Sequence, residues 1–211
     1  QTVEDLFVAN GMPASHAVAA ADVLIWADLR GIDSHGVSNM MTYYLAGLKD
    51  GSINPAPAWH TTRDFAAVAN VDSDRGLGLV VGPWAMNLAI EKARQFGIGC
   101  VVAGNGRHFG AAGYHAYMAA EQGMVGMAMT VGGLAVLPTF GSKPMVGLNP
   151  LAIAAPAATE APFIFDASMS SVAGNKIRLA RRLGVDVAGG WISEPDGTPI
   201  MDETPVPDVF H

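Results

Sequence analysis

Two stretches of the sequence place a histidine among residues that can hold or move a proton. In the first, Asp33, Ser34 and His35 bring a carboxyl, a hydroxyl and an imidazole together between two segments with helical apolar spacing. In the second, His108 stands in a glycine-rich stretch, residues 103–115, AGNGRHFGAAGYH. An imidazole exchanges its proton near neutral pH, and loops often carry catalytic groups. Both stretches are therefore candidates for acid–base chemistry; the alternatives are a helix cap at Ser34 and a histidine that only donates to a carbonyl.

The surroundings of His108 indicate a ligand-binding edge. The apolar segment 98–103 before it, IGCVVA, is typical of a buried strand, and a helix is expected after it. His108 would then lie at the carboxyl end of a strand, where open α/β sheets bind their ligands. Glycines permit close approach of the backbone, and a helix N-terminus favours an anion. Phe109 occupies the position of the third glycine of G-x-G-x-x-G, so this is not that dinucleotide fingerprint, and a glycine-rich turn with a solvated histidine is the alternative.

Two further polar residues stand at the ends of apolar segments. Asp166 ends the segment FIFD and precedes a serine-rich helix start, so it can cap that helix, orient a protonated histidine or meet a cofactor ribose. Asn149 precedes a proline at a strand entrance, which is a turn signal first and a ligand contact second.

Spacing disfavours two other chemistries. His108 and His115 on one helix would be about 10 Å apart along its axis, whereas the ligands of one metal ion lie about 2 Å from it. No cysteine or carboxylate cluster has metal-site spacing, so no metal site is predicted. The nucleophile elbow G-x-S-x-G does not occur, which ranks a serine hydrolase low.

Composition restricts the partners. The 211 residues are 50% hydrophobic and 15% charged, with a formal net charge of −7. A negative surface repels phosphates, so nucleic acid is not expected and a small molecule is. Cys100 is the only cysteine, which fits a reducing cytoplasm. The longest apolar run, residues 76–90, is broken by glycine and proline, so no membrane span is expected and the protein is predicted to be soluble.

The elements that would position these residues follow from periodicity. Apolar spacing predicts three helices before a proline-bearing linker, and hence an N-terminal helical lobe over residues 1–60. From residue 61 onward, strands alternate with helices, which predicts an α/β domain over 61–211 with a mostly parallel sheet flanked by helices. The expected strands are 65–72, 98–104, 124–131, 150–157 and 162–168, and the expected helices are 83–97, 111–123 and 171–184.

The sequence resembles the malate/L-lactate dehydrogenase-like family, which includes L-sulfolactate and ureidoglycolate dehydrogenases and cyclic ketimine reductases. The resemblance is carried by segments 28–44, 106–115, 136–156 and 165–180, in the family's order and approximate spacing. It implies an NAD- or NADP-dependent oxidoreductase of the EC 1.1.1 type without the common Rossmann fingerprint, and a homodimer. The implied reaction moves hydride between the nicotinamide and a small 2-hydroxy/2-oxo acid of the malate, lactate or sulfolactate type. The alternatives are a cyclic ketimine or imino acid reductase and an inactive nucleotide-binding fragment of a larger enzyme.

The resemblance also implies site residues. Its Ser-His-Gly element falls on Ser34 and His35, its second histidine on His108, and the acid of its relay on Asp166. We expect His108 to be the acid/base and His35 to contact the substrate, with the roles open to exchange. A substrate-facing tyrosine falls on Tyr43. The implied cofactor-binding residues are His108, Phe109, Gly110, Ala111, Ala112, Thr130, Gly132, Asn149, Asp166, Ala167 and Ser168.

Two departures from the family are visible. Most members carry arginine four residues after the first histidine, where a bidentate clamp for a carboxylate would stand. This chain has Asn39 there, so its substrate contact would be a neutral amide. The family also continues beyond the length of this chain with a glycine- and lysine-containing segment. This chain is therefore expected to be a fragment, or a second chain is expected to supply the rest of the nucleotide domain.

Overall fold

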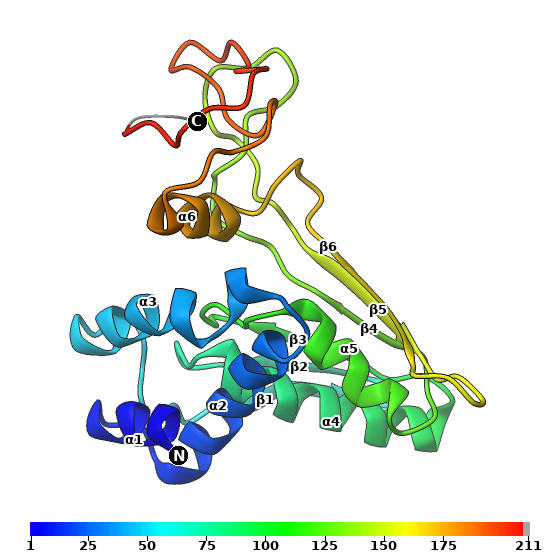
Figure 1. Cartoon of the computed structure of the whole chain (residues 1–211). Helices are drawn as coiled ribbons and strands as arrows, with labels where there is room; N and C mark the ends of the chain where they lie inside the picture. The colour runs from blue at the N-terminus through cyan, green and yellow to red at the C-terminus, as the bar shows by residue number, and fades with distance from the viewer. Residues whose placement is uncertain (209–211) are drawn as a thin grey trace. The chain divides into compact units, whose positions relative to one another are not determined.

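The computed structural model describes residues 1–208 (Figure 1). Contacts divide the chain into two units. The first unit comprises Gln1–Ala128 and Ile153–Phe165, and the second comprises Met129–Ala152 and the residues from Asp166 onward. The mixed α/β class predicted from the sequence is confirmed.

The first unit opens with helices. These are α1 (Thr2–Ala9), α2 (Ala14–Asp28), a one-turn 3-10 helix η1 (Asp33–His35) and α3 (Val37–Lys49). Their apolar faces meet in one core, whose fully buried side chains include Phe7, Leu24 and Tyr44. The turn η1 therefore stands between two helices, α2 and α3, that are held by the same core.

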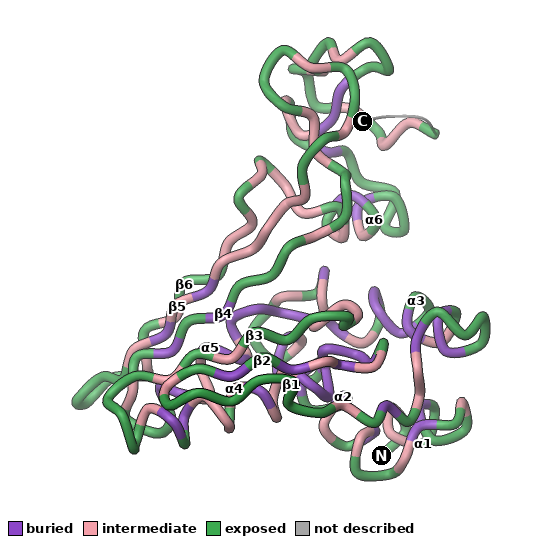
Figure 2. The backbone as a smooth tube through the Cα atoms, turned by 180° about the vertical axis from the view of Figure 1, so that it is seen from behind, coloured by how far each residue is buried: buried purple, intermediate pink, exposed green. Residues whose placement is uncertain are grey.

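A three-stranded sheet with strand order β1-β2-β3 follows. Its strands are β1 (His60–Phe65), β2 (Val68–Asp72) and β3 (Cys100–Gly104). β2 and β3 are parallel, but β1 pairs with β2 in the antiparallel sense. The sequence analysis predicted one mostly parallel sheet and assigned residues 60–64 to no strand. Figure 2 shows why β1 was missed: it is exposed along its length, so it carries no apolar alternation.

Two helices complete the first unit. α4 (Gly78–Phe96) packs against β2 and β3 and ends at Gly97 in the left-handed conformation, and α5 (Ala112–Ala120) packs against α4 (Figure 1). α4 begins at Gly78, five residues before the start at Pro83 that the sequence predicts. The extra turn is stabilised by burial, because Leu79 and Val81 are almost fully buried.

The loops that follow β2 and β3 continue side by side beyond the sheet. The Ser73 amide donates to the Gly104 carbonyl at 3.0 Å, and the Arg107 amide donates to the Gly76 carbonyl at 2.9 Å. The Gly78 amide then reaches the carbonyl of His108 at 3.2 Å. This extended pairing carries His108 to the N-terminus of α4.

A second three-stranded sheet has the order β4-β5-β6, formed by β4 (Gly126–Met129), β5 (Leu151–Ala155) and β6 (Phe163–Ala167). These strands lie within segments that periodicity predicted. The second unit has its own helix, α6 (Gly174–Leu183), and its own small core around Ile177, Ala180, Val187 and Ile192. Among residues 1–208, no helix combines the length and the apolar character needed to cross a lipid bilayer.

Candidate active site

The turn that carries Ser34 and His35 is fastened by Asp28 at the end of α2. One carboxylate oxygen of Asp28 accepts the Val37 amide at 3.0 Å and so satisfies an amide at the first turn of α3. The other oxygen fills the space beside Gly36, where an added Cβ would lie 1.6 Å from it. A glycine follows the histidine because any side chain would displace the carboxylate that caps the next helix.

Ser34 and His35 are hydrogen-bonded to each other. Ser34 Oγ lies 2.9 Å from His35 Nδ1, and the Ser34 side chain is buried. The side-chain amide of Asn39 donates to the Ser34 carbonyl at 2.8 Å, and Asn39 is also buried. Asn39, predicted to contact the substrate, thus also holds the backbone of the turn in place.

The two predicted histidines meet. The rings of His35 and His108 are stacked, with centroids 5.7 Å apart and planes at 14°. Both imidazoles are half-buried. Tyr43, predicted to face the substrate, is 45% exposed and presents its ring edge-on to His108 with centroids 6.0 Å apart. The fold therefore joins the two loop motifs in one cluster, formed by Ser34, His35, Tyr43, Tyr44 and His108.

Tyr44 was missed as a site residue. Its hydroxyl lies 2.7 Å from His108 Nδ1, although its side chain is fully buried. Tyr44 lies on the buried face of α3, and its ring packs in the core. The available signal was chemical, since a buried tyrosine hydroxyl almost always has a hydrogen-bond partner.

A third histidine supports the His108 loop from inside. His115 is 2% exposed, and its Nε2 lies 2.8 Å from the Phe109 carbonyl oxygen. Its ring stacks on Phe109 with centroids 4.8 Å apart, in space left by Gly82, where an added Cβ would lie 2.5 Å from the imidazole. Burial lowers the pKa of His115 to about 4, so this imidazole is neutral at physiological pH and donates through Nε2.

The remaining predicted cofactor residues of the first unit are packing positions. Gly110 has a φ of 77°, and an added Cβ would lie 2.8 Å from Leu79. Ala111, which directly precedes α5, and Ala112, its first residue, are 3% and 2% exposed. Their side chains therefore shape the loop from within.

In the second unit, the predicted cofactor residues form a cluster of their own. The Thr130 amide donates to the Pro150 carbonyl at 3.3 Å, and the Gly132 amide donates to the Asn149 side chain at 3.2 Å. The Met169 amide, just after Ala167 and Ser168, donates to the Leu148 carbonyl at 2.8 Å. Three separate segments, near residues 130–132, 147–150 and 166–169, thereby meet.

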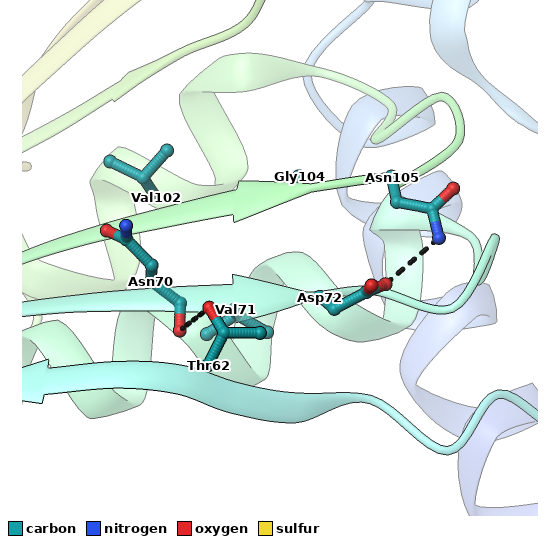
Figure 3. A pocket seen from close by; sticks show the side chains of 7 residues that line it. All are labelled: Thr62, Asn70, Val71, Asp72, Val102, Gly104 and Asn105. Carbon is teal, nitrogen blue, oxygen red and sulfur yellow. Dashed lines mark hydrogen bonds between the residues drawn. The ribbon is translucent and has the colours of Figure 1, made fainter.

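The structure also has a hollow on the sheet β1-β2-β3 that contains none of the predicted site residues. Figure 3 shows it between Thr62, Asn70, Val102 and Asn105, with Asn105 donating to Asp72 at 2.9 Å. The Thr62 hydroxyl donates to the Asn70 carbonyl at 3.2 Å, and no histidine lines the hollow. Within the described part of the chain, no three histidine, cysteine or acidic side chains are grouped so that they could hold a metal ion.

The chain is similar to known proteins over nearly its whole length. A sequence model described as malate/L-lactate dehydrogenase matches residues 1–208. The malate dehydrogenase of Pyrococcus horikoshii is 42% identical over 201 residues, which cover 95% of this chain and 54% of that protein. The L-sulfolactate dehydrogenase of Methanocaldococcus jannaschii is 38% identical, covering 94% of this chain and 57% of that protein.

A solved structure matches equally well. The crystal structure of malate dehydrogenase from Entamoeba histolytica superposes with a TM-score of 0.90 at 36% identity, covering 95% of this chain and 55% of that one. The chain thus spans about half the length of the relatives that it matches. The extent and strength of these matches lead to one conclusion: the chain belongs to the malate/L-lactate dehydrogenase family.

Proposed function

We propose that this protein is an NAD- or NADP-dependent oxidoreductase that interconverts a small 2-hydroxy acid and its 2-oxo acid. The observation that carries the proposal is the stacked pair His35 and His108, with Ser34 and Tyr44 hydrogen-bonded to the two rings. Family membership supports the reaction class, and related dehydrogenases are named for malate and for L-sulfolactate. Other relatives are named for NADP(+) and for NAD(+), so both cofactors remain within the proposal.

His108 is proposed as the acid/base. Its Nδ1 lies 2.7 Å from the Tyr44 hydroxyl, and Nε2 is proposed as the nitrogen that exchanges a proton with the substrate oxygen. An imidazole suits proton exchange in both directions near neutral pH. His35, stacked beside it and bonded to Ser34, is proposed to contact the substrate together with Tyr43.

The nicotinamide cofactor, when bound, supplies or accepts the hydride. In the second unit, the segments around Gly132 and Gly147 pack closely against each other, because a Cβ on Gly147 would lie 2.6 Å from the Gly132 carbonyl oxygen. Thr130, Asp166 and Ser168 stand nearby in the chain segments that meet there and supply hydroxyl and carboxylate groups. We propose the residues of this cluster and, separately, those of the loop His108–Ala112 as cofactor-binding residues, with Asp166 also a candidate for the acid of the relay.

Asn39 bears on the substrate. Its side-chain amide donates to the Ser34 carbonyl. Because an amide is neutral, Asn39 supplies no cation for a substrate carboxylate. The second candidate function is reduction of a cyclic imino acid, since one relative at 32% identity is named a Delta(1)-pyrroline-2-carboxylate reductase. The predicted homodimer, the cytoplasmic location and the functional division into residues 1–60 and 61–211 stay proposals that rest on the resemblance and on composition.

The test is a titration of NADH and NADPH against the purified chain, followed by nicotinamide fluorescence, with turnover on a panel of 2-oxo acids and cyclic imino acids. We expect one nucleotide to bind and one substrate class to be reduced, with His108→Ala lowering kcat by about 100-fold or more. The control is His60→Ala, which removes an exposed histidine from β1 and should leave turnover unchanged. A folded sample that binds neither nucleotide, or a His108→Ala variant as active as the parent, contradicts the proposal.

A further inference from the structure

The amide of Gly110 reveals which nitrogen of His108 carries the proton at rest. This N–H points at His108 Nδ1 over 3.3 Å, and an amide N–H can only donate. Nδ1 must then be an acceptor, and a neutral imidazole has a single N–H, so the proton is on Nε2. In this tautomer, the Tyr44 hydroxyl, 2.7 Å from the same Nδ1, is also a donor.

The resting tautomer is the wrong one for a base. To take a proton from an alcohol, Nε2 must be bare, and the proton of the neutral ring must then be on Nδ1. An Nδ1–H group faces both the Gly110 amide and the Tyr44 hydroxyl. The amide cannot accept this proton, whereas the phenol oxygen accepts it once the O–H bond rotates away. Of these two neighbours, only Tyr44 can serve both tautomers.

We propose that Tyr44 is a positioning residue whose hydroxyl reverses its hydrogen bond with His108 Nδ1 and so allows Nε2 to work as a base. The proposal rests on the function proposed above and deepens it. In the oxidation direction, Nε2 takes the proton of the substrate hydroxyl, and a hydride passes from the carbon that bears this hydroxyl to the oxidised nicotinamide. The resulting imidazolium keeps its Nδ1–H on the Tyr44 oxygen, and the reduction direction returns the Nε2 proton to the substrate oxygen.

The burial of Tyr44 makes this contact effective. The side chain is fully buried, and its ring lies against Phe7 with centroids 6.4 Å apart. Water therefore does not compete for the hydroxyl as it would at the surface, and an unmade hydrogen bond would be costly there. The neighbouring Tyr43 differs in this respect, because it is 45% exposed, and its ring meets that of His108 in a T-shaped contact.

The experiment compares Tyr44→Phe with Tyr43→Phe in the full chain. Nitrogen-15 NMR of the imidazole rings distinguishes the two neutral tautomers, with His108 assigned by the signal lost in His108→Gln. In Tyr44→Phe, the Gly110 amide stays as a donor to Nδ1, so the population should shift further toward the Nε2–H tautomer. Tyr43→Phe, the matched control, should leave this ratio unchanged.

Kinetics provide the second measurement. Removing the acceptor needed by the base form should lower kcat by about 10- to 100-fold while KM changes less than about two-fold, because a general base acts in the transition state. An unchanged tautomer ratio in Tyr44→Phe overturns the proposal, and so does a shifted ratio with undiminished kcat. If the parent protein shows no turnover, the proposed function fails, whereas the tautomer ratio still tests the Tyr44 contact.

A second variant covers the case in which Tyr44→Phe does not fold. Incorporation of a fluorotyrosine at position 44 keeps the shape of the side chain and makes the phenol a stronger donor and a weaker acceptor. The tautomer ratio should then move toward Nε2–H, as in Tyr44→Phe. A ratio equal to that of the parent overturns the proposal.

Discussion

At the scale of single residues, three histidines of one protein have three different environments. His108 faces a tyrosine hydroxyl and a backbone amide, His35 faces a serine hydroxyl, and His115 is buried against a carbonyl. Residue type alone does not distinguish these three histidines. The environment separates them, since His35 and His108 are half-buried and stacked while His115 is enclosed.

The buried histidine makes stability depend on pH. The folded-state pKa of His115 is about 4, below the ordinary value of 6.5, because burial disfavours the charged form. Between pH 4 and pH 6.5, the unfolded chain therefore binds a proton on this histidine that the folded chain does not. Folding stability thus falls as the pH drops from 6.5 toward 4. The loss amounts to roughly 3 kcal/mol at most.

We expect His115→Gln, which keeps a donor for the Phe109 carbonyl but does not titrate, to lose less stability than the parent on acidification. Urea unfolding at pH 7.5 and pH 4.5 measures the difference. The exposed His60→Gln should retain the pH dependence of the parent. An identical acid response of the parent and His115→Gln would show that His115 is not the group responsible.

At the scale of elements, the site depends on how helices begin and end. The end of α2 supplies Asp28, which caps α3 and thereby holds the 3-10 turn η1 between them. The paired extensions of β2 and β3 bring the second histidine to the N-terminus of α4. The chemistry-bearing side chains thus stand on short connections, while helices and strands fix the connections at both ends.

Gly36→Ala tests the first of these devices. The new Cβ would lie 1.6 Å from Asp28 Oδ1, so the carboxylate must move and the cap on Val37 is lost. We expect a loss of about 1 to 3 kcal/mol in the free energy of unfolding, measured by urea denaturation.

The double variant shows whether the clash is the cause. Asp28→Ala alone should cost about 1 kcal/mol for the lost cap. Adding Gly36→Ala to Asp28→Ala should then cost little, because the colliding group has gone. Strictly additive effects would mean that the carboxylate is not what requires a glycine at position 36.

At the scale of the whole molecule, the charge disfavours attraction of an anionic cofactor over long distances. The formal net charge is −7, and a dinucleotide carries phosphates. Affinity must therefore come from short-range contacts in the proposed cofactor cluster. In the second unit, the side-chain oxygen of Asn149 helps to organise that cluster by accepting a hydrogen bond from the Gly132 amide. Asn149 itself has a φ of 39°.

Asn149→Ala should therefore weaken nucleotide binding. Loss of one hydrogen bond that holds the cluster together predicts an increase in Kd of about 3- to 10-fold in the fluorescence titration. The matched control is Asn105→Ala, which removes another asparagine from the left-handed region, with φ 54° and a side-chain bond to Asp72, in the first unit. Equal losses of affinity in the two variants would contradict a specific role for Asn149.

The candidate residues that local chemistry marks could be predicted from the sequence. Ser34, His35 and His108 were found because glycines and segment ends reveal loops, and the strands β3 to β6 were found from runs of apolar residues. Family membership also followed from the order of four motifs along the chain, and the comparisons confirm it. These properties depend on near neighbours in the chain, so periodicity and turn chemistry suffice to read them.

Which of these groups meet depends on the packing of segments that are distant in the chain. Tyr44 and His108 are 64 positions apart, and nothing in the pattern around Tyr44 distinguishes a core tyrosine from one that binds a histidine. The exposed strand β1 lacks apolar alternation and exists because β2 pairs with it. The reason is the same in both cases: packing of distant segments selects the partner of a buried hydroxyl or of an open strand edge, and local propensity does not encode that selection.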